Sequence, residues 1–194
     1  VYADGTMSRT IWNHVDTLAA SVDQRGVART YQYDAAERRT AMTLEGNLPA
    51  GAGQTTFQAW RWDGLGRMTR AEDNDSIVEL SYDSLSRQVE DVQSIGTGAE
   101  RTSSGSGTMQ RAFDGVGNLR RQLYPSALTI NRTYDAVERL QTVKEGSTDL
   151  AGYEHMGMGS RRLSRTYAAS DVRLSCAYDG ERRPVRWDHV RTSD

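Results

Sequence analysis

Three groups of residues in this sequence have types and spacings that could support chemistry. Asp73-Asn74-Asp75 supplies side-chain oxygens at the start of a stretch, as a calcium-binding loop does. Asp63-Gly64-Leu65-Gly66 and Asp114-Gly115-Val116-Gly117 resemble the D-x-x-G element of nucleotide-binding sites. Histidines are common metal ligands and general bases. The chain has three of them, His14, His155 and His189.

Each group lacks the other residues that its chemistry requires. In a calcium loop the sixth and twelfth positions would be Val78 and Ser84, where Gly and a bidentate Glu are needed. No G-x-x-x-x-G-K-[ST] motif precedes the D-x-x-G elements, and the only lysine, Lys144, lies outside any Gly-rich loop. The histidines stand far apart in a chain with one cysteine, Cys176, which excludes a zinc motif and an internal disulfide. We predict no metal and no cofactor.

Catalytic groupings are equally unspecific. A nucleophile elbow has the form G-x-S-x-G, and Gly105-Ser106-Gly107 lacks that spacing. A glycosidase places two carboxylates roughly 5–10 Å apart. Among 26 acidic residues some pair meets that distance by chance, so the criterion does not discriminate. We therefore expect that the chain is not an enzyme.

Composition restricts the classes of partner and the size of the core. The 194 residues are 37% hydrophobic, which predicts a thin core. The 24 basic and 26 acidic residues give a net charge of −2, which argues against nucleic acid as a partner. No run of about 18 apolar residues occurs, so no membrane span is expected. The chain starts at Val1, and we expect it to be a piece of a longer chain.

The strongest pattern is a repeat of the form aromatic-Asp-small-x-small/Glu-Arg. Six clear copies contain Tyr33, Asp34 and Arg38; Trp62, Asp63, Gly66 and Arg67; Tyr82, Asp83 and Arg87; Phe113, Asp114 and Gly117; Tyr134, Asp135 and Arg139; and Tyr178 and Asp179. Two degenerate copies are expected. One starts at Trp12 with Asn13 in the Asp position, and the other runs from Tyr153 to Arg161 with Met156 in that position.

Each copy is typical of a β-hairpin. Trp60 and Trp62, two residues apart, share one face of a strand. The Asp then opens a turn in which its carboxylate can accept backbone N–H groups, and Gly66 or Gly117 suits a positive φ. We therefore predict an all-β fold, a spiralling array of antiparallel hairpins with about fifteen strands.

The domain prediction is a single array of seven to eight units over residues 1–194. Two Gly-, Ser- and Thr-rich insertions, 46–56 and 96–108, precede new repeats and are predicted to be mobile surface loops.

These units resemble the YD repeats of the RHS family, which includes bacterial RHS proteins, the C components of insecticidal toxin complexes and the teneurins. The resemblance covers about Trp12 to Trp187 and implies a long β-sheet that spirals into a hollow shell. In that family the repeated residues are structural. The chain is too short to close such a shell and lacks the self-cleaving Asp motif that ends bacterial shells, so no cleavage residue carries over. The resemblance implies a secreted or cell-surface location.

Two functions are consistent with these repeats. The first is a non-enzymatic shell or scaffold segment that encloses or displays a toxin, with flanking repeats or neighbouring subunits added by strand pairing. The alternative is an adhesive or glycan-binding module that assembles end to end into a filament. The candidates for glycan contact are Trp60, Trp62 and Trp187, which could instead cover the inner face of the sheet. Asn74 and Asn131 begin N-glycosylation sequons.

Overall fold

The computed structural model describes residues 5–46, 55–96 and 107–191, and these form sixteen β-strands and one short 3-10 helix. The strands of residues 5–96 are β1 (Arg9–Trp12), β2 (Leu18–Val22), β3 (Val27–Tyr33), β4 (Arg39–Gly46), β5 (Phe57–Trp62), β6 (Met68–Asp73), β7 (Ser76–Tyr82) and β8 (Gln88–Ile95). Those that follow are β9 (Gly107–Phe113), β10 (Leu119–Leu123), β11 (Thr129–Tyr134), β12 (Leu140–Glu145), β13 (Thr148–His155), β14 (Arg162–Tyr167), β15 (Val172–Tyr178) and β16 (Pro184–Arg191). The helix, η2, is Ala168–Ser170. The predicted all-β fold is confirmed.

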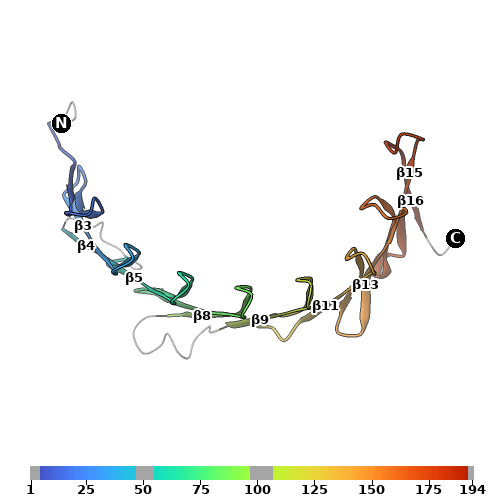
Figure 1. Ribbon diagram of the computed structural model, residues 1–194, viewed down its shortest axis with the longest axis horizontal. Helices are drawn as coiled ribbons and strands as arrows, with labels where there is room; N and C mark the ends of the chain where they lie inside the picture. The colour runs from blue at the N-terminus through green and yellow to red at the C-terminus, as the bar shows by residue number, and fades with distance from the viewer. Residues whose placement is uncertain (1–4, 47–54, 97–106, 192–194) are drawn as a thin grey trace. The chain divides into compact units, whose positions relative to one another are not determined.

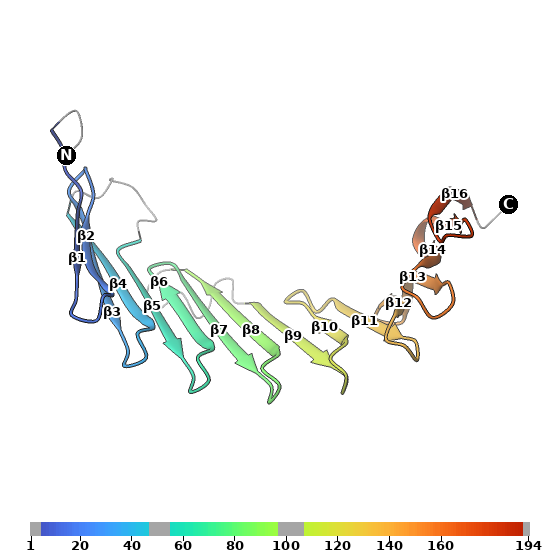
Figure 2. The ribbon, with the colours of Figure 1, turned by 45° about the horizontal axis from the view of Figure 1, so that its top comes forward.

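The chain divides into two compact units, residues 1–108 and 109–194. Within each unit every strand pairs antiparallel with the strands before and after it, in sequence order (Figure 1). Such a meander places alternate turns on opposite edges of the sheet. The turns that follow β3, β5 and β7 therefore lie along the same edge, as Figure 2 shows.

The turns that join odd to even strands share one backbone geometry, except the turn between β13 and β14, which is one residue longer. In the turn between β3 and β4, the amide of Asp34 donates to the carbonyl of Arg38, and the amide of Glu37 donates to the carbonyl of Asp34, both at 3.0 Å. The third residue after the Asp has a positive φ, for example 60° at Glu37 and 81° at Gly66. A bulge accompanies the turn, because the pairing register shifts between Gln32 and Tyr33. This is a type I turn closed by a residue in the left-handed region, a common three-residue hairpin loop.

The core is thin, as the composition predicts. The buried residues of the described chain are Val27, Ala151, Ser164 and Cys176. Most strand residues are half-buried, since each sheet is a single layer and its main contacts are between neighbouring strands. Among the described residues no helix is long and apolar enough to cross a bilayer.

Strands extend into both predicted insertions, at the start of the first and at the end of the second. Gly46 belongs to β4 rather than to the 46–56 loop, and β9 already begins at Gly107, inside the predicted 96–108 loop. The first strand continues because its backbone pairing does. Gly46 is opposite Val27, and the amide of Leu44 donates to the carbonyl of Thr56 at 2.7 Å. Residues 47–54 and 97–106 lie outside the described residues, so the mobility of these loops stays a prediction.

The left-handed turn position predicts opposite effects at two sites. Gly66→Ala places a side chain at φ 81° and should lower the free energy of unfolding by about 1 kcal/mol, the cost of that conformation for an L-residue. Glu138→Gly, at φ 65°, should relieve the same strain and leave the protein equally or more stable. Urea denaturation of both variants measures this. Equal midpoints for wild type and Gly66→Ala would contradict the strain argument.

Candidate functional site: the signature turns

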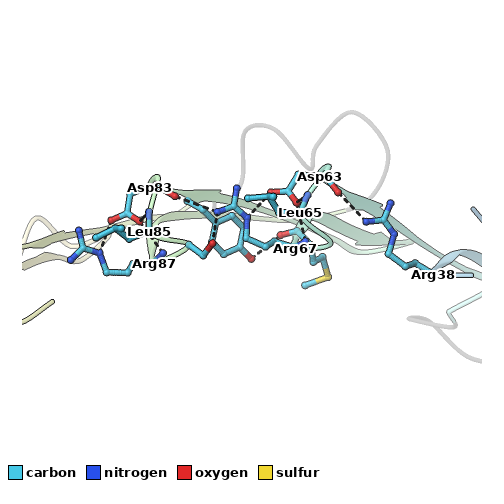
Figure 3. A network of polar contacts seen from close by, with 10 residues as sticks. Arg38, Asp63, Leu65, Arg67, Asp83, Leu85 and Arg87 are labelled. Atoms are coloured by element: carbon cyan, nitrogen blue, oxygen red, sulfur yellow. Dashed lines mark hydrogen bonds and ion pairs between the residues drawn. The ribbon is translucent and has the colours of Figure 1, made fainter. Parts of the chain in front are cut away.

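The Asp of each repeat organises its own turn. In the turn of β5 and β6, Oδ1 of Asp63 accepts the amides of Leu65 and Arg67, both at 2.9 Å, and Oδ2 accepts Nε of Arg67 at 2.6 Å (Figure 3). The same three bonds occur at Asp34, Asp83, Asp135 and Asp179. At Asp114 the side-chain amide of Asn118 replaces the guanidinium, at 3.1 Å. The carboxylate thus closes the loop and holds the side chain that ends the motif.

These bonds favour the ionised carboxylate. The backbone N–H of Arg67 is the main cause that holds the pKa of Asp63 below its ordinary value; partial burial opposes it and the Arg67 side chain adds to it. At Asp34 the guanidinium of Arg38 is the main cause of the lowered pKa. The pKa values of Asp83, Asp135 and Asp179 are lowered mainly by the backbone N–H four residues later.

The Arg of three turns, Arg38, Arg67 and Arg139, reaches forward to the next repeat. Nη1 of Arg38 donates to the carbonyl of Asp63 at 2.9 Å. Nη1 of Arg67 donates to the carbonyl of Asp83 at 3.3 Å and to Oγ of Ser86 at 3.1 Å (Figure 3). A guanidinium has enough donors to bind its own Asp and a neighbouring turn together. Each of these Arg residues therefore ties two consecutive turns to each other.

The aromatic residue of five of the six clear copies bonds backward to the preceding repeat. The hydroxyl of Tyr82 donates to the carbonyl of Met68 at 2.8 Å, and Nε1 of Trp62 donates to the carbonyl of Arg39 at 2.9 Å. In both cases the acceptor is the fifth residue after the previous repeat's Asp. The hydroxyls of Tyr33 and Tyr134 bind the carbonyls at the same spacing. The hydroxyl of Tyr178 binds the carbonyl of Arg162, the sixth residue after Met156, because that turn is one residue longer. Phe113 carries no polar donor. The aromatic position thus ties each of these repeats to the one before it.

Guanidinium groups also stack on aromatic rings. The guanidinium carbon of Arg67 lies 4.7 Å from the ring centroid of Tyr82, in the next repeat. That of Arg39 lies 4.7 Å from the Tyr31 ring and 5.9 Å from the Trp60 ring. These cation–π contacts lie within one hairpin, as between Arg39 and Tyr31, and between consecutive hairpins, as between Arg67 and Tyr82.

Sequence reasoning missed two turns of the same backbone geometry on the opposite edge. They start at Asp23, whose Oδ1 accepts the amides of Arg25 and Val27, and at Tyr124, whose amide donates to the carbonyl of Leu128. The sequence did offer a signal for the first of these turns, because Asp23 and Gly26 have the same spacing as Asp63 and Gly66. Gly26 indeed has a positive φ of 82°. Tyr124 has no side-chain signal of this kind.

The two degenerate copies also lie at turns between odd and even strands, and the Asn13 copy has the same backbone hydrogen bonds as the Asp turns. Oδ1 of Asn13 accepts the amides of Val15 and Thr17, both at 3.0 Å, so the amide oxygen replaces one carboxylate oxygen. In the other copy His155, not Tyr153, holds the aromatic position, because its Nε2 lies 2.9 Å from the carbonyl of Leu140. Leu140 is the fifth residue after Asp135, the Asp of the preceding repeat, so its carbonyl corresponds to the acceptors of the Tyr and Trp residues.

The structure does not bring the remaining candidates into one site. Trp60 and Trp62 are half-buried on β5, whereas Trp187 on β16 is 57% exposed. Asn74 bonds with Thr56, and Nδ2 of Asn131 donates to the carbonyl of Gly146. The assignment of these residues to glycan contact or glycosylation stays a prediction. No cluster of His, Cys, Asp or Glu suited to a metal ion occurs in residues 5–46, 55–96 and 107–191.

The outermost residue of several turns is apolar and exposed. It is the second residue after the Asp, as at Leu65 and Leu85, which are 72% and 63% exposed. Val116 and Val137 hold the same position in the second unit. Single exposed apolar residues are common on protein surfaces, so these residues do not by themselves mark a binding surface.

Solved structures share this fold, an open array of antiparallel hairpins. The TcdB2-TccC3 crystal structure matches with a TM-score of 0.69 at 17% identity and covers 96% of this chain and 10% of that chain. TcdB2-TccC3 without its hypervariable C-terminal region gives the same values. The Tc holotoxin pore of Photorhabdus luminescens matches with a TM-score of 0.69 at 17% identity and covers 98% and 10%.

The fold is therefore the RHS-type β-hairpin array, and the predicted resemblance is confirmed at the level of the fold. The chain spans about a tenth of the length of the solved chains that it matches. No protein-family model matches the sequence, and no curated protein is significantly similar to it.

The lowered pKa values predict loss of stability in acid. Because the folded-state pKa lies below the unfolded one, the unfolded chain takes up these protons first as the pH falls. The contribution of the turns is therefore full at neutral pH and declines below about pH 4. Thermal melting from about pH 7 to pH 3 measures it. Asp83→Asn, which keeps an acceptor oxygen as Asn13 does, should flatten the acid slope, and an unchanged slope would refute the assignment.

The backward hydrogen bond predicts a cost for one hydroxyl group. Tyr82→Phe removes the donor to the carbonyl of Met68 and should lower the free energy of unfolding by about 1 kcal/mol. Tyr31→Phe is the matched control, because the Tyr31 ring also lies under a guanidinium, that of Arg39, and its hydroxyl forms no hydrogen bond within the described residues. Urea denaturation compares the two. Equal effects of the two substitutions would contradict the inter-repeat role of the Tyr82 hydroxyl.

Proposed function

We propose that this chain is a non-enzymatic shell or scaffold segment of a large secreted RHS-type protein. The observation that carries this proposal is the use of the signature residues. Asp, Arg and the aromatic residue are joined to one another across consecutive repeats, so their polar groups serve to extend the sheet. A catalytic site is a single constellation, whereas these residues recur in most hairpins.

The single-layer architecture of the sheet favours a role as part of a shell wall rather than as an independent globular domain. A single layer with four buried residues among those described covers area efficiently but encloses no core of its own.

The solved neighbours support a toxin-related context. They are TcdB2-TccC3 chains and a Tc holotoxin pore, and this chain matches about a tenth of their length. An extracellular location and the enclosure or display of a toxin follow by analogy with them.

Strand pairing is the proposed contact with flanking repeats or neighbouring subunits. β1 is exposed along its whole length and β16 along most of it, and each has one paired neighbour among the described strands. An edge strand offers its free backbone groups as a template for another strand. Addition at either edge would extend the same meander.

One observation favours adhesion as a second candidate. Trp187 is 57% exposed on β16, and an exposed indole ring can stack on a sugar ring. Trp62 is less suited to this role because its indole N–H is already bound to the carbonyl of Arg39. Nothing in the comparisons supports carbohydrate binding.

A double variant separates the two functions. Trp60→Ala with Trp62→Ala should destabilise the sheet, by less than the roughly 3–5 kcal/mol of a fully buried Trp, if these rings hold the repeats together. Trp12→Ala, at a 60% exposed residue, is the matched control and should have little effect. A melting curve and a glycan array on each variant decide. Glycan binding by wild type that the double variant loses without destabilisation would favour adhesion.

Electron microscopy of the native, full-length protein that contains this chain tests the scaffold directly. Closed particles are the expected result for that protein. Continuous fibres would favour end-to-end assembly by strand pairing. A turnover by the wild-type chain that is lost on mutation of a specific residue cluster would contradict both functions.

A further inference from the structure

The turn between β13 and β14 departs from the other signature turns. Met156 stands in the Asp position, and the closing hydrogen bond runs from the amide of Met156 to the carbonyl of Arg161, at 2.8 Å. The turn is thus one residue longer than the Asp turns, in which the bond spans four residues. Its signature Arg161 has no carboxylate in its own turn.

This substitution leaves positive charge without compensation. In the Asp-Arg turns the carboxylate binds the guanidinium, for example Oδ2 of Asp135 and Nε of Arg139 at 2.7 Å. Arg161 instead donates Nε to the carbonyl of Arg182 at 3.0 Å. In the part of the chain that the structure describes, neither Arg161 nor Arg182 forms an ion pair. Two guanidinium groups of neighbouring turns therefore keep donors for an external anion.

A pocket opens at the same place. It has a volume of about 390 Å³ and is lined by Met156, Gly157, Met158, Gly159, Arg161 and Arg182. Met158 is 84% exposed and Met156 41% exposed. Arg139 fixes the pocket wall, because its Nη1 donates to the carbonyl of Gly157 at 2.5 Å and to that of Gly159 at 2.7 Å. The pocket thus combines a held backbone, two thioether side chains and two cationic groups.

We propose that this pocket binds an acidic polypeptide segment in which a carboxylate side chain lies beside an apolar one. The guanidinium groups of Arg161 and Arg182 receive the carboxylate, since such pairs form charge-assisted hydrogen bonds. Met156 and Met158 cover the apolar neighbour, and flexible thioether side chains adapt to different residues. A free phosphate ion would leave both methionines without a role, which favours a peptide.

Fluorescence anisotropy with the whole chain tests the charge requirement. The probe is a labelled hexapeptide of alternating Leu and Asp, and its control is the same peptide with Asn for Asp. The Asp peptide should bind at least about tenfold more tightly, because the control lacks the charge-assisted bonds. Its affinity should fall as salt is added, because the charges are exposed to solvent. Inorganic phosphate at millimolar concentration should compete only weakly.

Four variants localise the binding. Met156→Asp supplies the missing carboxylate to Arg161 and should abolish binding of the Asp peptide. Arg161→Gln should weaken it roughly tenfold, whereas Arg186→Gln, an equal charge change on β16, should leave it unchanged. Met158→Ser changes an exposed side chain and should weaken binding without changing the melting temperature. Circular dichroism confirms that each variant is folded.

Three results would overturn the proposal. The first is equal affinity for the Asp and Asn peptides. The second is wild-type affinity in both Met156→Asp and Met158→Ser. The third is displacement of the peptide by phosphate with no effect of Met158→Ser, which would define a simple anion site.

Discussion

The pairing of a turn carboxylate with the guanidinium four residues later is the interaction on which the structure depends. A single-layer sheet has no wide core, and its described part buries four residues. Backbone pairing alone leaves isolated hairpins marginally stable. The Asp carboxylate fixes the loop and orients the Arg, and the Arg then bonds the next turn, as Arg67 bonds the turn of Asp83. One side-chain pair thereby shapes a turn and links two repeats.

This arrangement resembles that of repeat proteins, in which stability is a sum of unit and nearest-neighbour contributions. The aromatic residue adds the opposite link, from Tyr82 back to the carbonyl of Met68. Where the Asp is lost, at Met156, the fold persists because Arg139 still holds the turn backbone through Gly157 and Gly159. Arg161, which has no carboxylate in its own turn, donates its Nε to the carbonyl of Arg182 in the next turn.

The sequence predicted local structure well and contacts between repeats poorly. The hairpins, the Asp-opened turns and the positive φ at Gly66 follow from spacing of a few residues, and local spacing limits what a turn can adopt. The bond from Arg38 to the carbonyl of Asp63 spans 25 residues. The insertion between these repeats makes their spacing differ from that of the other repeats, so no periodicity in the sequence reveals the bond. His155 was missed as an aromatic-position residue because its function there is to bond a backbone carbonyl, which an imidazole also does.

Hydrogen exchange of Arg67→Gln tests most directly whether the signature residues couple consecutive repeats. The amide of Arg87 donates to Oδ1 of Asp83, and the Asp83 turn is in turn bonded by Nη1 of Arg67. We expect faster exchange at the amides of Ser86 and Arg87, one repeat away from the substitution, as well as in the turn of Asp63. Faster exchange confined to the Asp63 turn, with wild-type protection at residues 83–87, would contradict the coupling of consecutive repeats.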